Sequence, residues 1–187
     1  MTTSLSTKDR LIQTAAQLFR RHGYHGVGLA ELLSAAQAPK GSLYHHFPAG
    51  KSDLALAAST WASDGMLRVL AASFEPAESF HEGFTTLSFK LAKLFDISGQ
   101  ADGCPITATL FDGPDNNAFR SHANHLFEGW MRETTHHGIR FGMTEDAAIQ
   151  LSEHGFLLIE GGWLLAQARR SSDVLRQLPR HLPDAPD

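Results

Sequence analysis

One short segment near the N-terminus brings together residue types that suit contacts with nucleic acid. Small residues permit close approach to a duplex, lysine can bind phosphate, and tyrosine and histidine can donate hydrogen bonds to phosphate oxygens. A tyrosine ring can also pack on a thymine methyl group. The residues with this chemistry are Lys40, Gly41, Ser42, Tyr44 and His45, with Lys51 close behind. Their order predicts a short helix whose N-terminal part enters the major groove of double-stranded DNA.

The charge along the chain is uneven. Residues 1–51 hold six Lys and Arg against two acidic residues, a net charge of +4, whereas residues 52–187 have a net charge of −8. A basic head on an acidic body predicts a polyanionic partner for the head alone. The alternative is a solvated basic face on a plain three-helix bundle, which the order of basic, small and aromatic residues on one helix disfavours.

Three helices and the start of a long fourth one are expected to position this segment. The first, capped by Ser6 or Thr7, should end at residues 22–23. Its apolar side follows helical spacing at Leu11, Ile12, Ala15, Leu18 and Phe19. A second helix is expected over residues 29–33 and a third over 40–46, with Pro39 in the first turn of the third. On that third helix, the spacing of Leu43 and Phe47 predicts core positions on the side opposite the groove.

The remainder of the chain also has helical periodicity. Helices are expected from Lys51 to about Ser73 and then over about 76–96, 105–112, 115–138, 145–170 and 173–181. Glycine, proline and asparagine separate them, and no segment has the sustained alternation of a strand. The predicted fold class is all-α: an N-terminal three-helix helix-turn-helix domain over residues 1–51 and a larger helical domain over 52–187.

The motif residues resemble a known family. Residues 23–24 read Gly-Tyr, residues 40–47 read Lys-Gly-Ser-Leu-Tyr-His-His-Phe, and residues 50–51 read Gly-Lys. This pattern is similar to the DNA-binding domain of TetR-family transcriptional regulators. Ala-Pro-Lys-Gly-Ser at 38–42, Phe-Pro-Ala-Gly-Lys at 47–51, Gly-Cys-Pro at 103–105 and Ile-Glu-Gly at 159–161 resemble its LmrA/YxaF-like branch. The resemblance implies a homodimeric repressor that leaves a palindromic DNA operator when a small molecule binds. It also implies that Lys51 meets the DNA backbone.

Two positions depart from the family pattern. Gln37 stands where the helix-turn-helix turn usually has glycine. A left-handed residue there would cost on the order of 1 kcal/mol of strain. Gly28 stands where a threonine or serine usually begins the second helix. The hydroxyl that often touches phosphate is therefore missing, and Gly28 is not expected to contact DNA.

The larger domain is rich in aromatic residues, with all three tryptophans and ten of the twelve phenylalanines. In the resembled family such a domain encloses an apolar effector cavity; core packing is the simpler explanation for each aromatic residue taken singly, and the set taken jointly favours a cavity. The candidate lining residues are Trp61, Phe89, Phe111, Phe127, Trp130, Met131, Phe156, Glu160 and Trp163. Glu160 lies in an apolar stretch, where its carboxylate needs a cation, a hydrogen-bond donor or a ligand. The expected effector is a largely apolar or aromatic small molecule.

A homodimer is expected through the helices at 145–170 and 173–181, because a palindromic operator requires two-fold symmetry. The residues expected at the seam are Leu151, His154, Leu158, Leu165 and Leu175. Gly161 and Gly162 would permit close approach of two helices there. A DNA-organising or partner-binding module without an effector is the alternative, which the aromatic content of the larger domain disfavours.

No cofactor, metal or catalytic residue is expected. His122-x-x-His125 and His136-His137 both lie on an expected helix, and the first pair could face one ion, but a third ligand cannot be identified. An enzyme or a metal-binding protein that kept such a bundle is the alternative from another class, and it lacks any phosphate loop or nucleophile motif. Cys104, the single cysteine, is expected as a small buried hydrophobe rather than a reactive thiol. Without a signal peptide or membrane span, the expected location is the cytoplasm.

Overall fold

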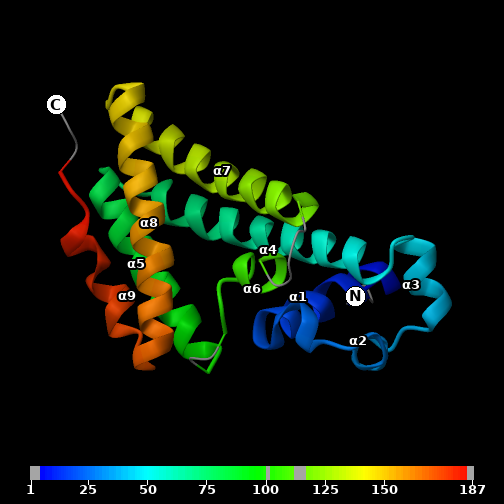
Figure 1. The fold of residues 1–187 in the computed structure, drawn as a ribbon. Coiled ribbons are helices and arrows are strands. Elements are labelled where there is room, and N and C mark those ends of the chain that lie inside the picture. Colours follow the sequence, from blue (N-terminus) through cyan, green and yellow to red (C-terminus); the bar gives the residue numbers. More distant parts are fainter. Residues whose placement is uncertain (1–4, 100–101, 112–116, 185–187) are drawn as a thin grey trace. The chain divides into compact units, whose positions relative to one another are not determined.

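The computed structural model describes residues 5–99, 102–111 and 117–184, and every regular element within those ranges is a helix (Figure 1). This confirms the all-α fold class. The elements are α1 (Thr7–Gly26), α2 (Leu29–Ala35), α3 (Lys40–His46), α4 (Lys51–Phe74), α5 (Phe80–Ile97), α6 (Thr107–Leu110), α7 (Asn117–Arg140), α8 (Glu145–Arg169), α9 (Asp173–Gln177) and the 3₁₀ helix η1 (Leu178–His181). The sequence predicts breaks at residues 99–103 and 113–114; residues 100–101 of the first break, the whole second break and residues 185–187 lie outside the described ranges.

The chain divides into two compact units. The first comprises Met1–Asp64 and Cys104–Asn124, and the second comprises Gly65–Gly103 and His125–Asp187. Helices α4 and α7 each supply residues to both units. The first compact unit thus contains the helix-turn-helix together with a segment from the middle of the chain. This division differs from the functional boundary expected after residue 51. That boundary stays a prediction.

Helix α1 begins and bends at residues that the sequence marks. Ser6 is its N-cap, and the Ser6 hydroxyl accepts a hydrogen bond from the Asp9 N–H at 3.1 Å. Gly23 has φ 71° and ψ 169°, so the helix kinks where the sequence predicts its end. One further turn carries the helix to Gly26. The kink redirects the chain immediately before Tyr24, a residue of the functional site described below.

The turn between α2 and α3 is a Schellman motif. The Ala38 N–H donates to the Leu33 carbonyl at 3.0 Å, and the Gln37 N–H donates to the Ser34 carbonyl at 3.1 Å. Gln37 has φ 50°, so it takes the left-handed conformation expected of it. The expected place of Pro39 was wrong by one residue. Pro39 is the N-cap of α3, because its ψ of 150° is extended while its carbonyl accepts the Ser42 N–H.

The first compact unit is closed by a helix from the middle of the chain. Helix α6 lies against α1, although the two are far apart in sequence (Figure 1). The buried apolar residues that fill this unit include Leu11, Phe19, Ile106, Leu110 and Phe119. No local pattern in the sequence predicts that α6 packs on α1, because several other apolar helices could cover either of them.

The second compact unit is built on α5, α8 and α9, which lie together in Figure 1. Glycines on α8 let side chains approach its backbone: Phe84 packs on Gly155 and Leu178 on Gly162. The expected start of α5 at residue 76 was wrong. The helix begins at Phe80 because the Ser79 hydroxyl accepts the Glu82 N–H at 3.2 Å and so caps it.

The exposed side of α8 carries large apolar residues among polar ones. Leu151 and Leu175, expected at a dimer seam, are instead 3% and 0% exposed, because they face the core shared by α5, α8 and α9. His154 is exposed and Leu158 is partly buried. The exposed large apolar residues of α8 are Ile149, Leu157, Leu164 and Leu165. We call these four residues the α8 stripe.

Candidate functional site

Helix α3 has a polar outer side and an apolar inner side. Leu43 is 0% and Phe47 4% exposed, which confirms the expectation that both belong to the core. Of the residues expected to meet DNA, Lys40, Gly41, Tyr44 and His45 are exposed and Ser42 is partly buried. A Cβ atom at Gly41 would meet nothing within 4 Å, so the surface there is open to a duplex.

Tyr44 is held against the turn that follows α3. A Cβ atom at Gly50 would lie 3.1 Å from Tyr44 Cε1, so the ring lies directly over that glycine. Gly50 also has φ +67°, a conformation that glycine adopts without strain. The closeness of the Tyr44 ring and the positive φ together explain why residue 50, which precedes Lys51, is a glycine. They also fix the Tyr44 ring beside the first turn of α4.

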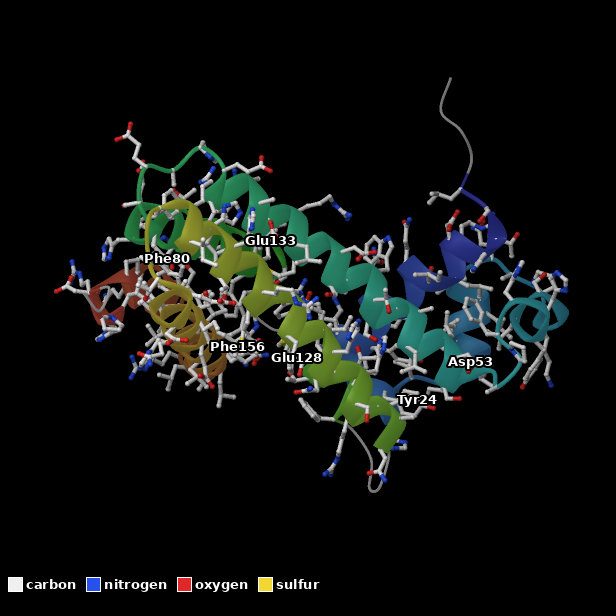
Figure 2. All side chains as sticks on the ribbon, turned by 90° about the horizontal axis from the view of Figure 1, so that it is seen from above. Tyr24, Asp53, Phe80, Glu128, Glu133 and Phe156 are labelled. Atoms are coloured by element: carbon white, nitrogen blue, oxygen red, sulfur yellow. The ribbon has the colours of Figure 1, made fainter. Side chains whose placement is uncertain are left out.

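The N-terminus of α4 is closed by side chains. Asp53 Oδ2 accepts from the Ala49 N–H at 2.7 Å, and the Ser52 hydroxyl donates to the Ala49 carbonyl at 3.1 Å (Figure 2 labels Asp53). The first hydrogen bond along the helix runs from the Leu54 N–H to the Gly50 carbonyl at 3.1 Å. Lys51 therefore stands at the positive end of the α4 dipole, where an anion is stabilised.

Lys51 lies over aromatic rings that the sequence reasoning did not include in the site. Its Nζ is 4.4 Å from the Tyr24 ring centroid and 5.9 Å from that of Phe19. The Tyr24 ring in turn contacts Phe19 at 5.7 Å and the edge of Phe119 at 5.3 Å, between centroids. Burial raises the pKa of Tyr24 above its ordinary value of 10, so its hydroxyl stays neutral. The Gly-Tyr pair after the first helix was the available signal.

Not all basic side chains of the N-terminal region are directed at a DNA partner. Arg10 donates to the Ala36 carbonyl at 3.2 Å, the Leu5 carbonyl at 3.0 Å and the Thr7 hydroxyl at 3.2 Å. Its contact with Ala36 satisfies a carbonyl at the end of α2. One of the six basic residues counted there is thus part of the structure of the helix-turn-helix. Gly28 is the N-cap of α2 and provides no side-chain cap, as its lack of a hydroxyl requires.

Three of the nine residues expected around an effector form one cluster in the second compact unit. Phe127 lies 5.4 Å from Trp130 and 5.0 Å from Phe156, and Trp130 lies 6.5 Å from Phe156, between ring centroids. Trp130 is 6% exposed, whereas Phe127 and Phe156 are partly buried. Phe156 extends from α8 beside α7 (Figure 2). We call these three side chains the aromatic cluster.

The remaining expected lining residues are dispersed. Trp163 packs edge-on to Phe95 at 5.5 Å, and its Nε1–H donates to the Asp102 backbone carbonyl at 3.0 Å. Met131 and Glu160 are partly buried. The other three are 40–52% exposed, with Phe89 in the second unit and Trp61 and Phe111 in the first.

The histidine pairs do not form a metal centre in the described ranges. His122 Nε2 lies 3.0 Å from Thr60 Oγ1, a hydrogen-bond contact whose direction depends on the histidine tautomer. Within residues 5–99, 102–111 and 117–184, no three His, Cys, Asp or Glu side chains are grouped to hold an ion. Cys104 is buried, as expected of a small hydrophobe.

A short helix with exposed basic, small and aromatic residues, set in a helix-turn-helix and followed by a larger helical domain, defines a DNA-binding transcriptional regulator. The family comparison agrees. Residues 11–58 match the model for bacterial regulatory proteins of the tetR family, and residues 81–181 match the model for the C-terminal domain of LmrA/YxaF-like transcriptional regulators. The chain belongs to the TetR family, in its LmrA/YxaF-like branch. Members of this family are regulators rather than enzymes, which removes the enzymatic alternative.

Relatives cover almost the whole chain. The HTH-type transcriptional regulator YxaF of Bacillus subtilis is 28% identical over 98% of this chain and 96% of its own length. A TetR regulatory protein from Rhodobacter sphaeroides has 25% identity and a TM-score of 0.80, with coverage of 93% and 95%. The regulator CifR, in a cysteine-mutant complex with a 26bp double-strand operator DNA, has 22% identity and a TM-score of 0.79, with coverage of 97% of each chain. None of the helices in the described ranges is long and apolar enough to cross a membrane.

Proposed function

We propose that this regulator is a repressor that binds a palindromic operator as a homodimer and leaves it when a small, largely apolar or aromatic effector binds. The observation that carries the DNA-binding part is the exposed set of residues on α3 beside the cationic start of α4. CifR, which shares the fold, is described as complexed with operator DNA.

The residues of this surface have different tasks. Gly41 and Ser42 are small and stand in the first turn of α3, where approach to base edges is closest. Lys40 supplies charge at the same end. Tyr44, His45 and Lys51 donate to phosphate oxygens and set the register of the helix on the duplex. The first group therefore determines sequence preference and the second supports affinity for any duplex.

The α8 stripe supports a homodimer. Leu157 is 61% and Leu164 67% exposed. Isolated chains in water rarely leave several large apolar side chains together on one helix. Gly161 lies between these two leucines in sequence, and a Cβ atom there would meet nothing within 4 Å. A second copy of α8 packed on this side would bury the stripe and approach closely at the glycine, and two-fold pairing also matches a palindromic operator.

The aromatic cluster supports effector binding in the second unit. Two of its three rings are partly buried, so an apolar ligand would gain contact area there without displacing a tightly packed core. Release requires that the effector favour a conformation with lower operator affinity, because a ligand that bound both conformations equally would change nothing.

The DNA-binding surface is tested with paired charge removals. Lys40→Ala/Lys51→Ala should lower operator affinity and reduce the slope of log K against log salt, because phosphate contacts release counterions. The matched control is Lys93→Ala/Arg132→Ala, which removes two exposed cations from α5 and α7. Equal affinity for the wild type and the Lys40/Lys51 variant would refute the assignment of this surface.

Effector binding is tested by titrating a panel of aromatic compounds against tryptophan fluorescence, with and without operator. Linkage requires that operator weaken the binding of a true inducer by the factor by which the inducer weakens operator binding. Phe156→Ala should abolish the binding, whereas Phe89→Ala, which truncates an exposed ring on α5, should not. Ligands whose affinity ignores the operator would not be inducers.

A further inference from the structure

We propose that Tyr24 is a positioning residue for Lys51, and that Phe119 at the start of α7 holds the Tyr24 ring in place for this task. The proposal rests on the proposed DNA-binding function, since it assigns Lys51 to the DNA backbone. Lys51 Nζ lies 4.4 Å from the Tyr24 ring centroid, within the range of a cation–π contact. Phe19 provides a more distant second ring at 5.9 Å.

The ring is fixed from two sides. Phe19 and Phe119 are 0% and 1% exposed, and their centroids lie 5.7 Å and 5.3 Å from that of Tyr24. Phe119 meets it at an interplanar angle of 88°, an edge contact that aromatic pairs favour. The kink at Gly23 turns Tyr24 away from the course of α1. Segments from three parts of the first compact unit thus combine to set one ring beneath Lys51.

A lysine held on a ring remains able to bind phosphate. The ammonium group has three N–H donors, and a cation–π contact with one ring does not use all three. An unsupported lysine side chain loses most of its rotamer freedom when it binds a phosphate, whereas Lys51 is already restricted before DNA arrives. Because burial raises the pKa of Tyr24, its hydroxyl stays protonated and no phenolate competes with phosphate for the lysine.

Operator binding over a range of salt tests the proposal. Tyr24→Phe keeps the ring and should bind like the wild type. Tyr24→Leu removes the π face and should weaken binding by about two- to fivefold. It should also flatten the salt slope in the direction of Lys51→Ala. Tyr24→Leu/Lys51→Ala should bind no more weakly than Lys51→Ala alone, since both changes act through one ammonium group. Losses that multiply in the double variant, or equal losses in Tyr24→Phe and Tyr24→Leu, would overturn the proposal.

A measurement without DNA separates this proposal from the proposed function. In protein with ¹³C-methylated lysines, the Lys51 resonance should be shifted by the ring in the wild type and in Tyr24→Phe, and should lose the shift in Tyr24→Leu. Phe119→Leu should reduce it. Ile106→Val, a change of a buried residue of the same unit, controls for lost stability and should keep the shift. A missing wild-type shift refutes the positioning by Tyr24, whereas normal operator binding by Lys51→Ala refutes the role of Lys51 in DNA binding.

Discussion

His137 is an ionisable side chain in the core of the second compact unit. It is 4% exposed and stacks on the Phe74 ring, with centroids 5.3 Å apart and 20° between the planes. Neither ring nitrogen has a hydrogen-bond partner among the described residues, although Glu133 Oε1 lies 3.4 Å from Nε2. Burial lowers the pKa of His137 from its ordinary value of 6.5, and the Glu133 charge opposes this only in part. The folded chain therefore favours the neutral ring.

The free energy of unfolding should consequently depend on the protonation of His137. The His137 ring is neutral in both states well above pH 6.5, so there the free energy of unfolding should not depend on its protonation. As the pH falls below that value, the unfolded chain takes up a proton more readily, so stability is lost down to the folded pKa. Urea denaturation at pH 7.5 and 5.5 should show a larger loss in the wild type than in His137→Phe, which keeps a stacked ring. Equal losses would contradict the prediction.

The turn between α2 and α3 carries a conformational cost that a single substitution can remove. Gln37 has φ 50°. Left-handed strain at Gln37 costs the folded chain roughly 1–2 kcal/mol, whereas a glycine there would cost about 0.4–1 kcal/mol because it makes the unfolded chain more flexible. Gln37→Gly should therefore stabilise the chain by about 0.5–1 kcal/mol. Gln17→Gly, the same replacement at an exposed site inside α1, should destabilise it by about 1 kcal/mol. Thermal denaturation measures both, and a loss of stability in Gln37→Gly would contradict the strain argument.

Two helical glycines should respond oppositely to alanine. A Cβ atom at Gly83 on α5 would overlap the fully buried Phe74 ring. Gly83→Ala should therefore cost about 1–3 kcal/mol. A Cβ atom at Gly129 on α7 meets nothing within 4 Å. Gly129→Ala should therefore gain up to about 1 kcal/mol of helix propensity. Urea denaturation of both variants measures the difference, and similar stabilities would show that α5 and α4 can separate to admit the methyl group.

Local chemistry made the helices around α3 predictable. Pro39, Gly50 and the Ser6 cap are residues with strong positional preferences, and they bracket α1, α3 and the start of α4. The start of α5 was missed because residues 76–79 offer polar candidates that resemble a first turn, and only the Ser79 hydrogen bond distinguishes them. Tyr24 was missed for another reason. Its partners Lys51 and Phe119 are remote in sequence, so their spacing carries no signal.

Assembly is the property of the whole molecule that local patterns left least defined. The sequence indicated the helices of the seam, but Leu151 and Leu158 have the same helical spacing whether they face α5 or a second copy. Only packing distinguishes the inner from the outer side of α8, and it assigns Leu151 to the core and Leu164 to the α8 stripe.

A charge in the α8 stripe should separate the chains without unfolding them. Leu164→Arg alters a side chain that is 67% exposed. The stability of the single chain should therefore change by only about 0.5 kcal/mol or less, and sedimentation equilibrium should show monomers at micromolar concentration. Palindromic operator affinity should fall about 100-fold or more, because the second half-site is then bound by a separate molecule. Ile97→Arg, at a 72% exposed residue of α5, should remain dimeric. A dimeric Leu164→Arg would remove the stripe from the interface.

The strength of pairing through the α8 stripe also determines how operator occupancy depends on the amount of this protein in the cell. If two chains must pair before an operator is occupied, occupancy at copy numbers below the dimer dissociation constant rises with the square of the amount synthesised. Halving the number of chains then lowers occupancy about fourfold rather than twofold. If the α8 stripe pairs the chains weakly, operator occupancy therefore rises steeply with the number of chains. If it pairs them tightly, occupancy rises in proportion to that number.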